Sequence, residues 1–246
     1  MEDVFAEDLG SSGTALVDLR VGTLAEHLAD VARTLQRAST PQDTLETLCR
    51  LAVNILDAKY AAVTVVRGGR YNTEAATHEV CRRLDHLKNA TGEGPCLDAL
   101  LADEVVISND LQRESRWPRF VRTAVRGTPV RSMASFRLFS QNGALGALNV
   151  YSDTVGAFGA HTEPVGVAIA AQAAIAYHAA LQQDTIDNLR IALETSRTIG
   201  TAIGVLMALH KITVDEAFAV LRTASQRSHR KLRDIAEEVV RTGTVR

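Results

Sequence analysis

The spacing of apolar residues changes twice along the chain. Between Leu24 and about residue 56, apolar side chains recur every three or four positions, which is the spacing of an amphipathic helix. Thr40 and Pro41 mark the start of a second helix in this stretch, because threonine is a good N-cap and proline suits the first turn. Between residues 58 and 151 the apolar runs are short, and from Thr162 to the end the helical spacing returns. We therefore expect helices at both ends and strands in the middle.

The middle of the chain carries the signals of two β-hairpins. Asn142-Gly143, a pair that suits a tight hairpin turn, lies between the last two apolar runs. Short helices are expected at residues 95–101 and 118–126. Clustered strands flanked by helices favour an α+β fold with an antiparallel sheet over alternating βαβ units. Strands are expected at residues 60–66, 71–77, 105–107, 130–139 and 146–151.

The long helix that follows Thr162 has two apolar faces. One face repeats at the three-four spacing of a coiled coil, and the other runs from Ile199 to Leu209. A helix that is apolar on two sides must bury both, so we expect one face against the C-terminal helices and the other against a second copy of the chain. A single buried helix in a monomer is the alternative. The residues expected in the dimer seam are Ile175, Ile186, Leu189, Leu193 and Ile203.

Two further helices complete the C-terminal end. Thr213 and Glu216 form a capping-box pattern at the start of one, and the other is expected at about residues 230–241. Three helices joined by short turns make a module near the lower size limit for independent folding. The expected divisions of the chain are a disordered leader at 1–20, a first domain with its N-terminal helix at 21–180, and a three-helix domain at 181–246.

The charge is divided unevenly between the two ends. Hydrophobic residues make up 46% and charged residues 23% of the 246 residues, which is enough apolar material for a buried core. Residues 1–185 hold 17 Lys+Arg against 22 Asp+Glu, whereas residues 186–246 hold 10 against 7. An acidic body with a basic end fits a protein whose end binds a polyanion.

Export and metal binding are not indicated. The N-terminus is acidic, unlike a signal peptide, and the apolar stretch 165–180 is short and interrupted by polar residues, as in a buried helix. Cys49, Cys81 and Cys96 are odd in number and widely spaced, so they predict neither a disulfide framework nor a zinc site. We expect a cytoplasmic protein without a metal.

Two features near the C-terminus point to binding. Five basic residues and no acid lie between residues 222 and 233, interleaved with serine, glutamine and histidine, which suits phosphates, sugars and base edges. A solvated surface corner is the alternative explanation. Gly200 and Gly204 lie four apart in a helix, where each costs roughly 1 kcal/mol against alanine, so either close helix packing or direct binding is expected there.

These C-terminal motifs resemble the ANTAR domain, the RNA-binding module of transcription antiterminators. The resemblance covers residues 186–246 and implies a dimeric three-helix module that binds paired stem-loops in nascent RNA and prevents formation of a terminator hairpin. The matching stretches are Ser196-Arg197-x-Ile199-Gly200, Ala202-x-Gly204-Val205-Leu206-Met207, Asp215-Glu216-Ala217-Phe218, Leu221-Arg222, Ala224-Ser225-Gln226 and Lys231-Leu232-Arg233-Asp234-Ile235-Ala236.

Two positions depart from the family pattern. Ile203 stands where the family usually has a lysine, and His229 where it favours an asparagine. Loss of a lysine removes one phosphate-directed charge and is expected to weaken binding. His229 can still hydrogen-bond to a base or stack on one. The expected RNA-binding residues are Arg197, Thr201, Arg222, Ser225, Gln226, Arg227, Ser228, His229, Arg230, Lys231 and Arg233.

The first domain, over roughly residues 40–180, resembles the GAF sensor domains found before ANTAR modules. Its matching stretches are Gly92-Glu93-Gly94-Pro95-Cys96-Leu97-Asp98-Ala99-Leu100, Arg116-Trp117-Pro118-Arg119-Phe120, Val130-Arg131-Ser132-Met133 and Gly146-Ala147-Leu148-Asn149-Val150-Tyr151-Ser152. The resemblance implies a pocket for a small ligand whose identity is open, as is any cofactor. The expected ligand-binding residues are Glu93, Cys96, Trp117, Arg131 and Asn149.

Enzymatic activity is not expected. The sequence lacks a Gly-x-Ser-x-Gly elbow, a Walker loop and a His-Glu-x-x-His pair. Cys96 falls in the first turn of an expected helix, where the helix dipole lowers a thiol pKa, so a redox sensor or GAF-type redox enzyme stays an alternative to a packed cysteine. A DNA-binding regulator, or a protein-interaction module that has lost RNA binding, is also compatible with this sequence.

Overall fold

The computed structural model describes residues 26, 28–68, 70–101, 104–140 and 143–244. The chain divides into two compact units, Met1–Leu181 and Gln182–Arg246. The boundary falls inside a single helix, α6 (Thr162–His210). The leader expected to be disordered lies outside the described residues.

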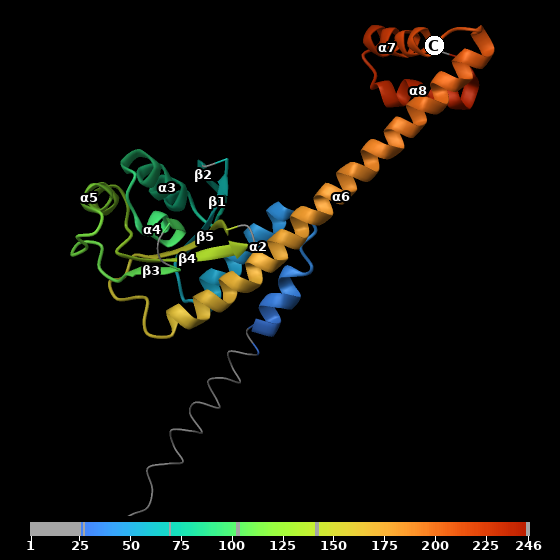
Figure 1. Ribbon diagram of the computed structural model, residues 1–246. Helices are drawn as coiled ribbons and strands as arrows, with labels where there is room; N and C mark the ends of the chain where they lie inside the picture. The colour runs from blue at the N-terminus through green and yellow to red at the C-terminus, as the bar shows by residue number, and fades with distance from the viewer. Residues whose placement is uncertain (1–25, 27, 69, 102–103, 141–142, 245–246) are drawn as a thin grey trace, which may run out of the picture. The chain divides into compact units, whose positions relative to one another are not determined.

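The first unit is built on a five-stranded antiparallel sheet (Figure 1). Its strand order is β2-β1-β5-β4-β3, so the two hairpins meet along the β1–β5 pair, where Val63 lies opposite Leu148. Alternating side chains along each strand face opposite sides of the sheet, and both sides are covered by helices. The strands are β1 (Tyr60–Arg67), β2 (Arg70–Ala76), β3 (Val105–Ser108), β4 (Ser132–Ser140) and β5 (Gly143–Ser152).

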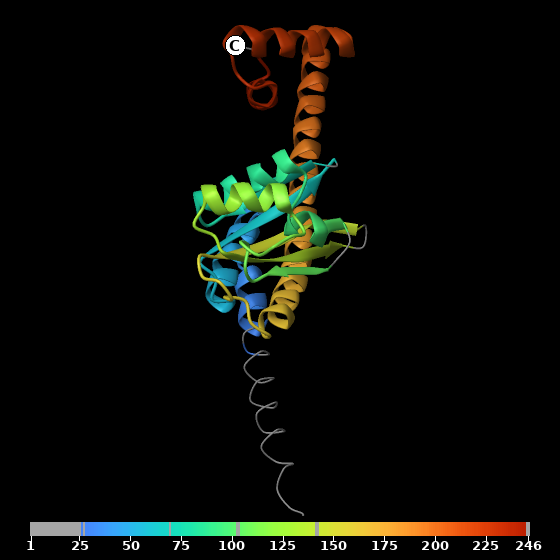
Figure 2. The same cartoon turned by 90° about the vertical axis from the view of Figure 1, so that its left-hand side faces the viewer.

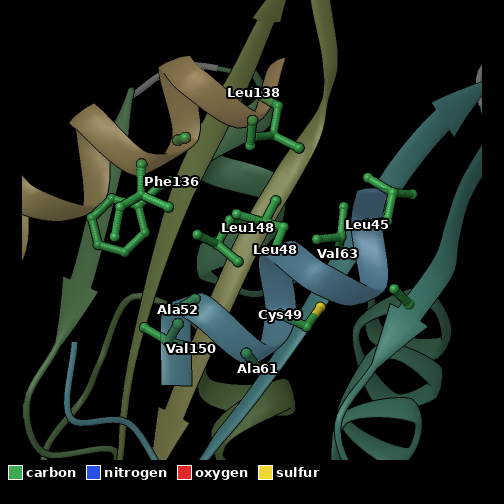
Figure 3. Packing of buried hydrophobic residues seen from close by; sticks show 14 of the residues in the cluster. Leu45, Leu48, Cys49, Ala52, Ala61, Val63, Phe136, Leu138, Leu148 and Val150 are labelled. Carbon is green, nitrogen blue, oxygen red and sulfur yellow. The ribbon is translucent and has the colours of Figure 1, made fainter. Parts of the chain in front are cut away.

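One face of the sheet packs against α2 (Pro41–Ile55) and the first turns of α6 (Figure 3). Thr40 caps α2 by accepting a hydrogen bond from the N–H of Asp43, as expected for a threonine before proline. Gly166 of α6 lies so close to the buried ring of Phe136 that a Cβ there would stand 2.3 Å from it. On this face of the sheet, side chains of the core therefore contact the backbone of α6 directly.

The opposite face carries α3 (Glu79–Thr91), α4 (Pro95–Leu101) and α5 (Pro118–Gly127), on the other side of the sheet from α2 (Figure 2). Trp117 and Phe120 are buried in the cluster between these helices and the sheet. This second layer differs from the first because it buries the charged side chains of Asp85 and Lys88, whereas the polar side chains that α2 buries, Thr44 and Thr47, are uncharged.

The second unit consists of the end of α6, α7 (Val214–Ser228) and α8 (Leu232–Thr242). The expected capping box is present, with Thr213 and Glu216 each accepting a hydrogen bond from the backbone of the other. The core of this unit consists of Ala202, Leu206, Ala217, Leu221, Ile235, Ala236 and Val239.

The α+β fold class with a long helix and a helical C-terminal module is confirmed. Helix α3 was not predicted from the sequence, and α8 begins at Leu232, two residues after its expected start. Among the described residues one helix, α6, is long and apolar enough to cross a membrane, with a mean hydropathy of 1.4 in its most apolar window. Its residues Ile169, Ala173 and Tyr177 are buried in the first unit, as in the core helix of a folded domain.

Candidate nucleic-acid interface and candidate sensor site

The basic residues expected to bind RNA lie where α7 ends and α8 begins. We call residues 222–233 the basic corner. Within it Arg222, Arg227 and Lys231 are exposed. Among the residues that the structure describes, none of these three has a carboxylate within 4.0 Å, whereas Arg230 and Arg233 do. The first three cations are therefore the ones most available to a phosphate.

Other residues of the basic corner shape its backbone. The Ser225 hydroxyl donates to the carbonyl of Arg230 at 2.6 Å, and the Arg230 guanidinium donates to Glu238 at 2.7 Å. Ser228 donates to the carbonyl of Ala224 at 2.7 Å. The Ser228 bond lies within α7, whereas the bonds of Ser225 and Arg230 tie the turn to α7 and α8, so these two residues contribute to the form of the corner.

His229 adopts the left-handed backbone conformation that ends α7, with φ of 53°. Glycine and asparagine tolerate this conformation better than most residues. The family's preference for asparagine at this position can thus be explained by the backbone conformation, in addition to the RNA contact that the sequence suggests. The exposed ring of His229 stays available for such a contact.

Arg197 and Thr201 are exposed on α6, where the Thr201 hydroxyl donates to the Arg197 carbonyl at 3.0 Å. A Cβ added at Gly200 or Gly204 would meet nothing within 4 Å among the described residues, so close packing against them does not explain the two glycines. Of the expected seam residues, Ile203 packs partly on the core of its own unit. The others, Ile175, Ile186, Leu189 and Leu193, are 67%, 47%, 59% and 70% exposed.

The first unit contains a buried polar cluster that the sequence predicted only in part. The Lys88 ammonium donates to Asp85 Oδ1 at 2.8 Å, to Thr64 Oγ1 at 3.2 Å and to Cys96 Sγ at 3.6 Å. Asn149 extends the cluster across the sheet, donating to Thr64 at 3.1 Å and accepting from Ser135 at 2.8 Å. The side chains of Asp85 and Lys88 are only 8% and 3% exposed, so this is a buried ion pair.

Burial governs the protonation of this cluster. It raises the pKa of Asp85, although the charge of Lys88 acts in the opposite direction. Burial also raises the pKa of Cys96, against the effect of Lys88. The pKa of Cys96 is therefore raised and not lowered, contrary to the expectation from its place in the first turn of a helix, because the thiol is buried.

A small cavity of about 10 Å³ adjoins the ion pair, with room for about one water molecule. Asp85 Oδ2 has no hydrogen-bond partner among the described residues, and Asp85 is one of the residues that line the cavity. The remaining lining is mainly apolar and aromatic. The lining residues are Leu84, Asp85, Lys88, Gly94, Pro95, Cys96, Phe120, Met133 and Tyr151.

Glu93 fastens the loop beside this cavity to α5. Its carboxylate accepts hydrogen bonds from the backbone N–H groups of Arg119 at 2.8 Å and Phe120 at 3.2 Å. It also pairs with the Arg119 guanidinium at 3.2 Å. Because Gly94 and Phe120 both line the cavity, this clasp holds two of its walls together.

The five expected ligand-binding residues do not share one position. Cys96 lines the cavity, Asn149 donates to Thr64, which is bonded to the ion pair, and Glu93 accepts from the backbone of Phe120 in the cavity wall. Trp117 is buried and donates to Asp98 at 2.7 Å, while Arg131 donates to the carbonyls of Thr128 and Val130. Of the five, Cys96 alone is among the lining residues, and the role of all five in ligand binding stays a prediction.

Comparison with known families gives the two units their class. A family model of the GAF domain matches residues 38–178, and a model of the ANTAR domain matches residues 187–240. The two units are thus a sensor-type domain and an RNA-binding module of the antitermination type. The chain belongs to the GAF domain family and has the GAF–ANTAR architecture.

Solved structures support the fold of the first unit. The GAF domain of an Acinetobacter phosphoenolpyruvate-protein phosphotransferase is 14% identical, with a TM-score of 0.53 over 66% of this chain and 98% of that one. The corresponding Coxiella burnetii domain is also 14% identical, with a TM-score of 0.51 over 66% and 96%. A free methionine-R-sulfoxide reductase from Thermoplasma acidophilum is 19% identical over 56% of this chain and 92% of that one, with a TM-score of 0.46. A search of curated protein sequences returned no significant match.

Proposed function

We propose that this protein is a signal-responsive, cytoplasmic regulator of transcription antitermination that binds paired RNA stem-loops as a homodimer. In this proposal residues 1–20 are a leader, residues 21–180 sense a small molecule, and residues 181–246 bind RNA. The observation that carries the proposal is the ANTAR match together with the exposed Arg222, Arg227 and Lys231 of the basic corner. Cations without carboxylate partners are the groups that phosphates bind.

The proposed link between signal and RNA is α6. Its residues Ile169 and Ala173 belong to the core of the first unit, and Ala202 and Leu206 belong to the core of the second. Every side chain from residue 182 to residue 194 is exposed, including the seam residues Ile186, Leu189 and Leu193. A second copy that covers this seam would place two basic corners in one assembly, as two stem-loops require. A ligand acts as a signal if it favours one arrangement of this helix pair over another.

RNA binding is tested with the full chain and an RNA that carries two adjacent hairpins, at two salt concentrations. We expect the double variant Arg227→Ala/Lys231→Ala to lose at least about tenfold in affinity and to bind with a salt slope that is smaller by roughly 1 to 2. The matched control is Arg122→Ala/Arg126→Ala, two exposed arginines of α5 in the first unit, which leaves affinity within about twofold. Equal binding of a single hairpin or of duplex DNA would support an altered or lost RNA function.

The dimer is tested by sedimentation of a Leu189→Glu variant. A charge at the centre of an apolar seam is expected to shift the protein from dimer to monomer, because burial of an unpaired charge is costly. The control is Arg190→Glu, which places the same residue at an exposed position one residue further along the helix. An unchanged mass for Leu189→Glu would place any interface elsewhere.

A further inference from the structure

The unpartnered oxygen of Asp85 gives the cavity of the first unit a specific chemistry. In a buried carboxylate both oxygens normally accept hydrogen bonds, because leaving one unsatisfied costs desolvation energy. Oδ1 is bonded to Lys88 and Thr64, whereas Oδ2 has no partner among the described residues. The side chain is more than nine-tenths buried and lines the cavity. Asp85 Oδ2 therefore needs a hydrogen-bond donor from whatever occupies the cavity.

Lys88 cannot serve a ligand in the same way. Its ammonium has three protons, and three acceptors surround it: Asp85 Oδ1, Thr64 Oγ1 and Cys96 Sγ. Binding a ligand acceptor would require one of these bonds to break. The cavity thus offers an acceptor and no spare donor from this pair.

The charge of the pair decides between ionic and neutral ligands. Asp85 and Lys88 together are neutral, and the rest of the lining carries no charged side chain. A bound ammonium would add an unbalanced positive charge beside Lys88, and a carboxylate would face Asp85 Oδ2 directly. Both are disfavoured beside a charged pair that is more than nine-tenths buried. A neutral donor satisfies Oδ2 without either penalty.

We infer that the sensor cavity binds a small neutral molecule that presents a hydroxyl or N–H donor to Asp85 Oδ2 and a short apolar body to Phe120, Met133 and Tyr151. This inference rests on the proposed function, since it names the class of ligand for the proposed sensor domain. The cavity of about 10 Å³ holds about one water molecule, so a larger ligand requires it to widen, and we expect the Gly92–Gly94 loop to part from α5 for this. The Glu93 clasp is the contact that such an opening must release.

The test uses the full chain with ¹³C-labelled methionine methyl groups. Met133 lines the cavity, and Met207 lies in the second unit as an internal control. The probes are 1-propanol, propionate and n-propylammonium, which share a three-carbon body and differ in the polar group. We expect 1-propanol to shift the Met133 signal saturably and the Met207 signal little, and the two ions to bind at least tenfold more weakly. An unmoved Met133 signal, or equal or better binding of either ion, overturns the inference.

A variant that removes the carboxylate without leaving a lone charge sharpens the test. Asp85→Leu/Lys88→Leu replaces the whole buried pair with apolar side chains, a change that proteins often tolerate. We expect this variant to bind 1-propanol at least tenfold more weakly, as measured by the saturable shift of the Met133 signal. The matched control is Asp30→Leu/Arg33→Leu, an exposed ion pair with the same i,i+3 spacing, which keeps the response. If the buried variant does not fold, the three-probe comparison on the unmodified protein decides.

RNA affinity, measured separately, distinguishes this inference from the proposed function. Absence of RNA binding both without and with 1-propanol would remove the proposed function and leave the Met133 result standing. Conversely, intact RNA binding with no response of Met133 to 1-propanol would remove the inference alone.

Discussion

Arg230, in the turn between α7 and α8, pairs with Glu238 in the second half of α8, with the guanidinium donating to the carboxylate at 2.7 Å. The pair is partly buried, since the side chains are 43% and 13% exposed. An arginine in a basic corner thus has an intramolecular carboxylate partner. Its effect on RNA binding includes the effect of holding the corner in shape, and a loss on Arg230→Ala does not by itself identify a phosphate contact.

Glu238→Gln separates these two roles. We expect this variant to lower the free energy of unfolding of the second unit by about 0.5–1 kcal/mol, the range of a partly exposed ion pair. RNA affinity should hold or rise, because a negative charge near the proposed phosphate site is removed. The Met207 methyl signal in a urea titration reports the unfolding, and a binding titration reports the affinity. A tenfold loss of affinity would mean instead that RNA binding depends on the ionic pair to hold the corner in shape, because the substitution removes no cation that could contact a phosphate.

His229 is expected to carry a conformational cost. A non-glycine residue at φ of 53° is strained relative to glycine, so His229→Gly should stabilise the second unit by about 0.5–1 kcal/mol. The matched control, Gln226→Gly, lies on an exposed position inside α7 and should destabilise by about 1 kcal/mol. The two substitutions to the same residue thus have opposite expected signs, which the Met207 reporter can resolve. Destabilisation by both would mean that the His229 ring makes contacts that outweigh its backbone.

How far the sequence predicts the structure depends on the type of signal. Patterned apolar runs and turn residues located the sheet, α2 and α7, because each combines a strong period with a recognisable cap or turn. The helix α3 was missed because charged Asp85 and Lys88 occupy its inward face beside Cys81 and Leu84. Its N-cap is His78, which is not a common capping residue. Gly92, in the left-handed conformation at its end, was the one available terminator signal.

Because α3 was not predicted, most residues of the candidate sensor site were not predicted either. Charged residues in a sequence pattern are taken to face solvent, so an ion pair that the fold buries is not anticipated. Cys96 and Asn149 were found through the family resemblance, whereas Asp85, Lys88 and Thr64 were not. Opposite charges at i and i+3 on the face that holds Cys81 and Leu84 are the signal that could have indicated them. The basic corner was easier to find because exposed charge needs no tertiary partner to be recognised.

Acid stability of the first unit should depend on Glu114. Hydrogen bonds from Arg116 to its carboxylate, at 2.6 Å from the guanidinium and 2.9 Å from the backbone N–H, lower the pKa of Glu114 to about 2. The folded state therefore holds the ionised carboxylate more firmly than the unfolded state, whose pKa is about 4.3. The stabilisation is present above that value and is lost as pH falls toward 2.

Glu114→Gln is expected to show this pH window directly. The variant should be less stable than the unmodified protein at pH 6, and the difference should shrink between about pH 4.5 and pH 2. Trp117 fluorescence during urea unfolding reports the first unit, in which this tryptophan is buried. Glu79→Gln, an exposed acid in the first turn of α3, serves as the control. A stability difference that persists unchanged at pH 2 would assign the effect of Glu114 to packing and not to charge.

Two glycines of α6 should respond oppositely to alanine. At Gly166 a Cβ would stand 2.3 Å from the buried Phe136 ring, so Gly166→Ala should destabilise the first unit by about 1–3 kcal/mol despite the better helix propensity. At Gly200 a Cβ would meet nothing within 4 Å, so Gly200→Ala should stabilise the second unit by about 1 kcal/mol. Trp117 fluorescence measures the first effect and the Met207 signal the second.

The Gly200 variant also tests why a helix keeps an exposed glycine at that cost. If Gly200→Ala is more stable and binds the two-hairpin RNA with unchanged affinity and as a dimer, nothing approaches this face in the working assembly. The variant could instead be more stable but bind RNA, or associate as a dimer, at least tenfold more weakly. RNA or a second copy of α6 would then approach this face so closely that a methyl group does not fit. A measurement of mass and affinity on the same sample decides which partner it is, because loss of the dimer lowers the mass and loss of an RNA contact does not.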